Sequence, residues 1–295
     1  MKPAPFDYVR PATLAEACVL LAGDADARLI AGGQTLVPMM AMRLARPSKL
    51  IDIARLDDLR GIREVDGAIV LGAATRQVDA ERSALVAAKL PLLAKALPWV
   101  GHAPTRNRGT IGGSIANADP AAEIGLVLAT LDGSVTVREG NATRAVPVEK
   151  LFLGPMTTSL PASGCLTEVR FPVWMGTAVG TGFHEVSARK SDFAYVSAAA
   201  QVELDSSGTC LRCHVGIGGA TPVPTRLTSA DDLVGTKLEP AKVREAVLAD
   251  TPKIEIMQDA HASLAYRRRV AAALAERAIL EARDDARAKL KGGRA

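Results

Sequence analysis

The sequence has few aromatic residues, few cysteines and no long apolar run. Phe, Tyr and Trp make up 3% of its 295 residues, so a core must be packed mainly from Ala, Val and Leu within a hydrophobic share of 48%. No stretch of about 18 uncharged apolar residues occurs, which excludes a membrane-spanning helix. The first residues contain no apolar segment of signal-peptide length, and we therefore expect a cytoplasmic protein.

Charge of neither sign dominates the chain. It has 36 Lys and Arg against 32 Asp and Glu, a net charge of +4, and no basic stripe interleaved with aromatic residues. Such a stripe is typical of nucleic-acid-binding surfaces, because contacts to the phosphate backbone supply much of the affinity. We therefore expect no nucleic-acid partner.

The four cysteines suit a reducing compartment. Cys210 and Cys213 form a C-x-x-C pattern, whereas Cys18 and Cys165 stand alone. The pattern lies in an expected strand, where residues three apart point to opposite faces of the sheet. Because no second cysteine pair completes a zinc or iron–sulfur site, we interpret these two strand cysteines as small hydrophobic residues and predict no metal site in this chain.

Helix and strand patterns predict an α+β fold with three parts. Residues 1–55 read as a small α/β lobe, residues 56–175 as a larger lobe with a mixed sheet, and residues 176–295 as a C-terminal domain of three-stranded antiparallel sheet with helices. In the small lobe, the expected helices are 13–22 and 36–44 and the expected strands are 28–31 and 49–53. Thr13 and Glu16 read as a capping box at the first helix.

The other two parts are less regular. In the larger lobe we expect strands over 68–73, 134–138, 144–148 and 165–171, a helix over 83–98 broken by Pro91 and Pro98, a link over 99–109 and a helix over 120–131. In the C-terminal domain we expect strands over 181–188, 195–204 and 209–217, helices over 240–249 and 261–286, and a frayed tail over 289–295. The last helix has a broad Ala and Leu face, which predicts that it packs on the sheet.

Two glycine motifs stand out against this background. Residues 30–36 read Ile-Ala-Gly-Gly-Gln-Thr-Leu, and residues 110–123 read Thr-Ile-Gly-Gly-Ser-Ile-Ala-Asn-Ala-Asp-Pro-Ala-Ala-Glu. Paired glycines let backbone N–H groups converge on an anion, and a helix that follows adds the positive end of its dipole. One such motif is usually an ordinary turn. Two with matching flanks favour a pyrophosphate held from both sides, and hence a dinucleotide.

These motifs, in this order and at this separation, resemble those of the FAD-binding medium subunit of the molybdenum hydroxylases, the family of xanthine dehydrogenase and aerobic carbon monoxide dehydrogenase. The resemblance extends over nearly the whole chain, including residues 216–226 and 262–268 near the C-terminus. It implies that the first two parts form a two-lobed FAD-binding domain and that the C-terminal domain covers the flavin.

The resemblance also implies a set of FAD-binding residues. Their backbone amides and short polar side chains would surround the pyrophosphate, the ribose and the flavin. They are Ala31, Gly32, Gly33, Gln34, Thr35, Leu36, Gly101, His102, Thr110, Ile111, Gly112, Gly113, Ser114, Asn117, Asp119, Glu123, Leu160 and Phe193.

Several of these residues have a structural alternative. Asp119 before Pro120 is also a good N-cap for the next helix. His102 is one of four scattered histidines and has a structural interpretation. Many relatives carry Asp at the position of Glu123. The side chain of Glu123 is one methylene longer, so its contact with FAD is open. Phe193 would stack on the flavin where some relatives have Tyr, or it would be ordinary core, and Tyr195 is the other candidate for the flavin side.

By resemblance, the chain is the FAD-carrying electron-transfer subunit of an oxidoreductase. Its partners would be a large subunit with the molybdopterin cofactor and a small subunit with [2Fe–2S] clusters, as a dimer of heterotrimers. Electrons would pass from the clusters through FAD to an external acceptor, which requires no catalytic acid or base, so we name no catalytic residue. The alternatives are a standalone FAD-dependent oxidase or reductase with a similar FAD domain, and an interaction protein that has lost the cofactor.

Overall fold

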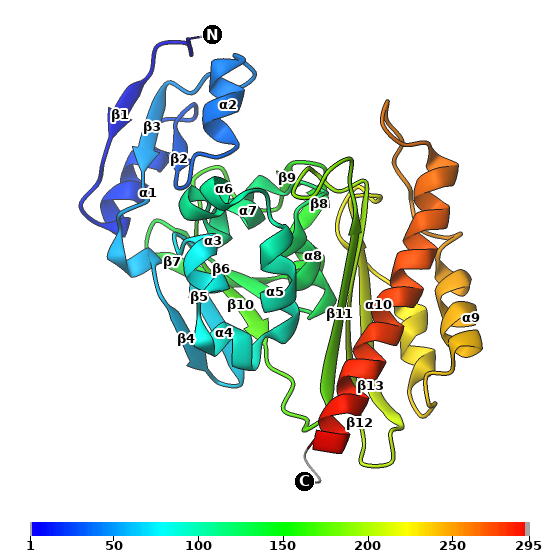
Figure 1. Cartoon of the computed structure of the whole chain (residues 1–295). Coiled ribbons are helices and arrows are strands. Elements are labelled where there is room, and N and C mark those ends of the chain that lie inside the picture. Colours follow the sequence, from blue (N-terminus) through cyan, green and yellow to red (C-terminus); the bar gives the residue numbers. More distant parts are fainter. Residues whose placement is uncertain (1, 293–295) are drawn as a thin grey trace.

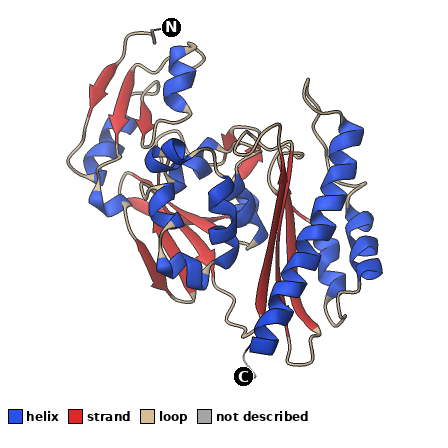
Figure 2. Ribbon diagram, viewed as in Figure 1, coloured by secondary structure: helices blue, strands red, loops and turns tan. Residues whose placement is uncertain are grey.

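The computed structural model describes residues 2–292. Three parts follow one another along the chain and across the molecule, from the small lobe (blue) through the second lobe (cyan to green) to the C-terminal sheet and helices (Figure 1). Each part has its own sheet, and Figure 2 shows helices packed beside each of them. The fold is α+β, as predicted. No helix among the described residues is long and apolar enough to cross a membrane.

The small lobe is built on a parallel sheet in the order β1-β3-β2. Its elements are β1 Asp7–Val9, α1 Leu14–Ala22, β2 Arg28–Ile30, α2 Leu36–Ala41 and β3 Lys49–Asp52. The side chain of Thr13 caps α1 by accepting a hydrogen bond from the Glu16 N–H at 3.2 Å. Glu16 in turn accepts from the N–H of Ala12 at 2.7 Å. The sequence pattern missed only β1, which is short and mostly exposed.

The second lobe contains a sheet in the order β4-β5-β10-β6-β7. Its strands are β4 Ile62–Val65, β5 Ala68–Gly72, β6 Ser134–Glu139, β7 Ala142–Pro147 and β10 Cys165–Pro172, with a small hairpin of β8 Phe152–Gly154 and β9 Thr157–Thr158. Every pairing in the large sheet is antiparallel, so the expectation of a mixed sheet was wrong in this detail.

Helices cover this sheet in short pieces, because prolines and glycines interrupt the apolar runs. They are η1 Asp57–Leu59, α3 Gln77–Glu81, α4 Ala84–Lys89, α5 Pro91–Ala96, η2 Leu97–Trp99, α6 Ala103–Arg108, α7 Ile111–Asn117, α8 Glu123–Thr130 and η3 Val148–Lys150. Two expectations need correction here. The supposed link over 99–109 contains α6, and the second glycine motif is not a turn but the start of α7.

The C-terminal part pairs its strands in the order β11-β12-β13-β14, all antiparallel. Its elements are β11 Val179–Val186, β12 Val196–Leu204, β13 Cys210–Gly218, β14 Thr225–Arg226, η4 Thr228–Leu233, α9 Pro240–Asp250 and α10 Leu264–Gly292. The expected three strands are present, and the two-residue β14 is added at the edge. The predicted tail is helical as far as Gly292, and its last three residues lie outside the described chain.

The two faces of the C-terminal sheet have different neighbours. Ala198 and Ala200 on β12 face α10, within an apolar cluster that includes Ala278 and Ala282. The alternate residue Ala199, with Phe183 on β11, packs into the core of the second lobe instead. The sheet is therefore held between the long helix and the second lobe, which places one end of β11 and β12 beside the glycine motifs.

Cys210 and Cys213 do not lie on opposite faces as expected. The pairing of β12 with β13 shifts between Glu203 and Leu204, so a bulge in β13 inserts one extra residue. Both side chains then enter the same apolar cluster, each about 1% exposed. The interaction between the two thiols lowers the pKa of Cys210, whereas the same interaction and burial raise the pKa of Cys213. Neither forms a disulfide.

Candidate functional site

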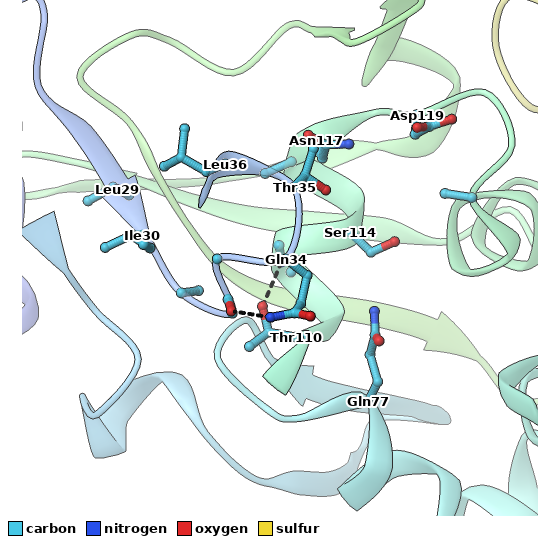
Figure 3. A pocket seen from close by; sticks show the side chains of 18 of the residues that line it. Leu29, Ile30, Gln34, Thr35, Leu36, Gln77, Thr110, Ser114, Asn117 and Asp119 are labelled. Atoms are coloured by element: carbon cyan, nitrogen blue, oxygen red, sulfur yellow. Dashed lines mark hydrogen bonds between the residues drawn. The ribbon is translucent and has the colours of Figure 1, made fainter. Parts of the chain in front are cut away.

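A single cavity of about 940 Å³ collects nearly all of the predicted site residues. It is lined by the small lobe, the α6–α8 region of the second lobe and the loop that joins β11 to β12. Figure 3 shows the part of it between the small lobe and the second lobe. Seventeen of the predicted residues line it: Ala31, Gly32, Gly33, Gln34, Thr35, Leu36, Gly101, His102, Thr110, Gly112, Gly113, Ser114, Asn117, Asp119, Glu123, Leu160 and Phe193. The exception is Ile111, which is 0% exposed and points into the core of the second lobe.

The first glycine motif is a backbone loop between β2 and α2 with free hydrogen-bond donors. Within the described chain, no amide N–H of residues 32–35 donates to a protein acceptor. Gly33 has φ +69°, a conformation that costs little only without a Cβ. The Gln34 side chain folds back and donates from Nε2 to the Gly32 carbonyl at 3.2 Å (Figure 3). Four unpaired amides on the wall of a cavity are available to bind an anion, as in a backbone nest.

The second glycine motif uses its amides inside the protein. Thr110 is the N-cap of α7, and its hydroxyl oxygen accepts the Gly113 N–H at 3.1 Å. The N–H groups of Ile111 and Gly112 donate to the carbonyls of Thr75 and Ala73 at 3.0 and 2.9 Å. The expectation that the glycines of both motifs supply free N–H groups was therefore wrong for this one. It presents side chains to the cavity, including those of Ser114 and Asn117 in Figure 3.

The first motif closely approaches the two residues that precede the second motif, where the lobes meet. A Cβ on Gly32 would lie 2.5 Å from the Arg108 carbonyl oxygen and 2.8 Å from the Gly109 Cα, both of them backbone atoms. Only glycine allows this approach, because a folded backbone cannot move aside as a flexible side chain would. Gly32 therefore closes the floor of the cavity between the lobes, in addition to its place in the nest.

The acidic residues after α7 differ from one another. Asp119 accepts the Ala121 N–H at 2.9 Å through Oδ1, but the N-cap of α8 is Ala122, so the N-cap alternative was wrong for Asp119. Glu123 is the first residue of α8, is 8% exposed and has no salt-bridge partner in the described chain. Burial raises its pKa from 4.5 to about 7. At neutral pH this carboxyl is therefore partly protonated and able to donate a hydrogen bond.

The mouth of the cavity is formed by the loop after β11. Phe193 lines it and is 74% exposed, so the interpretation of this side chain as core was wrong. Tyr195 lies elsewhere, partly buried beside the C-terminal apolar cluster and stacked on His261 with ring centroids 6.0 Å apart. Arg189 reaches Asp192 with a 3.0 Å ion pair at the same mouth. Of the two aromatic candidates, Phe193 faces the cavity.

Some residues that line the cavity lie outside both glycine motifs. Leu21, Leu29 and Ile53 form an apolar wall beside the first motif, built from separate elements of the small lobe. Gln77, at the start of α3, is 5% exposed and its Oε1 has no hydrogen-bond partner. No local sequence signal marks these positions, because a helix residue and a strand residue far apart in the chain meet only in the fold.

Comparisons with known proteins agree with this arrangement. Residues 4–174 match the family model of the FAD binding domain in molybdopterin dehydrogenase, and residues 181–282 match the carbon monoxide dehydrogenase flavoprotein C-terminal domain. The chain is 37% identical to the 6-hydroxypseudooxynicotine dehydrogenase complex subunit alpha of Paenarthrobacter nicotinovorans, over 97% of both chains.

Solved structures are similar over the same length. Carbon monoxide dehydrogenase from Hydrogenophaga pseudoflava superimposes with a TM-score of 0.92 at 32% identity, over 97% of this chain and 99% of that one. Quinoline 2-oxidoreductase from Pseudomonas putida 86 gives a TM-score of 0.92 at 34% identity, with the same coverage of each chain. Two family models cover most of the chain, and the resemblance inferred from the glycine motifs is confirmed: the chain belongs to the family of FAD-binding subunits of the molybdopterin dehydrogenases.

Proposed function

We propose that the cavity binds FAD and that the chain transfers electrons from the iron–sulfur clusters of a partner subunit through this FAD to an external acceptor. The observation that carries the proposal is the cavity of about 940 Å³, which both glycine motifs line and into which the first presents unpaired amides. That volume lies within the range of sites for large cofactors. The bound flavin supplies the redox chemistry, and the protein binds it, orients it and controls access to it.

Different residues of the cavity suit different parts of FAD. The N–H groups of residues 32–35 suit the pyrophosphate, because unpaired amides bind anions without a cationic side chain. Thr110, Ser114 and Asn117 offer hydroxyl and amide groups from the opposite wall. The apolar wall of the small lobe suits an adenine ring. Phe193 at the mouth offers an aromatic face to the flavin.

We further propose how the chain is organised and with what it assembles. Residues 1–55, 56–175 and 176–295 act as two FAD-binding lobes and a C-terminal domain. The relatives carry names such as medium subunit and complex subunit. We infer a large molybdopterin subunit and a small [2Fe–2S] subunit as partners, in a dimer of heterotrimers in the cytoplasm.

The direct test is to purify the full chain, remove any bound cofactor and titrate it with FAD. Binding quenches flavin fluorescence, and the absorption spectrum of the loaded chain reports the flavin. We expect stoichiometric binding and competition by ADP, which shares the diphosphate and the adenine. A folded chain that takes up no FAD would overturn the proposal.

The partners are tested separately. The chain is tagged in its native host and isolated under mild conditions, and the co-purifying subunits are identified by mass spectrometry. The mass of the intact complex distinguishes a heterotrimer from its dimer. Isolation of a flavin-loaded chain that is alone and oxidises a substrate by itself would favour the standalone oxidase instead.

A further inference from the structure

A second buried carboxyl lies behind the wall of the cavity. Glu185 is on β11, opposite Ser197 of β12, and both of its carboxyl oxygens are buried with no hydrogen-bond partner. The Ser197 hydroxyl is likewise buried and unpartnered. An unpaired buried carboxylate is costly, so such a group is either protonated or serves a purpose. Glu185 faces the second lobe, on the same side of the sheet as Phe183.

The first turn of α8, which begins at Glu123, lies over the part of the sheet that carries Glu185. Glu185 is opposite Ser197, and Ser197 is opposite Gly218. A Cβ on Gly218 would lie 3.3 Å from the side chain of Leu126, one turn after Glu123.

Burial, and to a smaller extent the charge of Glu123, raises the pKa of Glu185 from 4.5 to about 8. The charge of Asp119 raises the pKa of Glu123, and the charge of Arg106 lowers it. Arg106 is bound to Glu81, with two hydrogen bonds at 2.8 and 3.1 Å, so it does not neutralise the pair.

The remaining charged groups on the adjoining elements are engaged elsewhere. Lys95 of α5 contacts Glu281 of α10 at 2.8 Å, and His184 of β11 contacts the same carboxylate at 3.1 Å. Asp119 has one oxygen bound to a backbone amide. No cation among residues 2–292 forms a salt bridge with Glu123 or Glu185. The two carboxyls therefore share one low-dielectric region, with Glu123 on the cavity side and Glu185 behind it.

We propose that Glu123 and Glu185 form a proton-binding pair in the wall of the cavity, which takes up a proton when negative charge enters the cavity. The inference rests on the proposed function, because FAD is the source of that charge. The step is a protonation: a carboxylate takes a proton from solvent or buffer and becomes a carboxylic acid, and no electron moves. Two neighbouring carboxyls in one buried region titrate as a pair. An anion close to them makes the second ionisation harder still.

The first experiment measures the protons that accompany FAD binding. The cofactor-free full chain is titrated calorimetrically with FAD at about pH 7.5, in two buffers with different ionisation enthalpies. From coupled titration we expect an uptake on the order of a few tenths of a proton per FAD. Glu123→Gln and Glu185→Gln should each reduce the uptake by at least about half. Glu245→Gln, on the exposed side of α9, is the matched control and should leave it unchanged.

The second experiment does not depend on FAD. Infrared spectra of the cofactor-free chain, recorded across pH in heavy water, report the carbonyl band of protonated carboxylic acids. We expect a band that persists at neutral pH and decreases in Glu185→Gln, whereas Glu245→Gln retains it. If the wild-type chain lacks that band at neutral pH, neither buried carboxyl is protonated there, and the proposed proton-binding pair is contradicted.

The two experiments separate the two proposals. A chain that binds FAD without proton uptake contradicts the carboxyl pair and leaves the FAD site standing. A chain that shows the band but binds no FAD contradicts the proposed function instead. Glu123→Asp keeps the carboxyl and should retain part of the uptake, which distinguishes proton binding from a purely structural role of the side chain.

Discussion

The two glycine motifs look alike in sequence and differ in the structure. In the first, between β2 and α2, four consecutive amides have no protein acceptor and line the cavity. In the second, the corresponding amides cap α7 and donate to carbonyls of the segment that follows β5. A Cβ on Gly112 would lie 2.5 Å from the Ala73 Cβ, so this glycine lets α7 pack against that strand. The first motif leaves its amides free on the cavity wall, whereas the second uses its amides to join α7 to the rest of the second lobe.

The difference shows what a glycine pair can be used for. The same residue type allows backbone amides to face an anion in one place and allows two elements to pack closely in the other. If the assignment is correct, changes in the first motif should alter cofactor affinity, and changes in the second should mainly alter stability. The following predictions test this division, beginning with the largest expected effect.

Gly32→Ala should be the most damaging change, because its Cβ would collide with backbone atoms of residues 108 and 109. We expect FAD affinity to fall by about 100-fold, ~3 kcal/mol, from the forced separation of the lobes. The measurement is fluorescence titration of the cofactor-free chain. Gly154→Ala is the matched control, since a Cβ there meets no atom within 4 Å. If Gly32→Ala and Gly154→Ala bind FAD with equal affinity, the first motif is not part of the FAD site.

Glu123 at the end of the second motif and Glu185 on β11 should make stability depend on pH. The pKa of Glu123 is raised from 4.5 to about 7 and that of Glu185 to about 8, so the native state binds protons more tightly than the unfolded chain. Their contribution is fully present below about pH 4.5 and is lost as the pH rises through these two values. Glu185→Gln should therefore be more stable than the wild type at about pH 9, by on the order of 2 kcal/mol.

Urea unfolding of both chains, at about pH 5 and about pH 9, measures this difference. Other groups titrate in both chains, so only the difference between variant and wild type is compared. Glu245→Gln serves as the exposed control. A wild-type advantage that grows with pH would have the opposite sign and would refute the assignment.

Thr110→Ala should act on stability, because the Thr110 hydroxyl caps α7 through the Gly113 N–H. Loss of an N-cap costs about 1 kcal/mol, or about 2–4 °C in Tm for a domain of this size. Thr110→Ser keeps the oxygen and should recover most of the loss. If thermal unfolding is unchanged in Thr110→Ala while FAD affinity collapses, the division between the motifs is reversed.

Gln34→Ala should have the smallest effect and should act on binding alone. Its side chain is exposed and only steadies the loop through the Gly32 carbonyl. A hydrogen bond of this kind contributes about 0.5–1 kcal/mol, so we expect FAD affinity to fall about 2- to 5-fold. Tm of the cofactor-free chain should not change. Calorimetry and a thermal melt on the same sample measure both.

Much of the site could be predicted because its elements are local. The strand, glycine loop and helix of residues 28–41 follow from a short apolar run and a glycine pair, and the structure has them in that order. The second motif was misread because glycine disfavours helix interiors, so α7 was expected as a turn. Contacts with Ala73 and Thr75 outweigh that preference. The bulge that brings Cys210 beside Cys213 had no signal in the strand alternation.

The sequence by itself determined the class of fold, the family, and which residues gather around one cavity, because these follow from motifs whose chemistry is local. Only the tertiary structure decided which amides stay free, that Phe193 and not Tyr195 faces the cavity, and that Glu123 and Glu185 share one buried region. The physical reason is that a hydrogen-bond partner, a degree of burial and a charge–charge interaction each belong to pairs of residues far apart in the chain. Folding alone brings those pairs together.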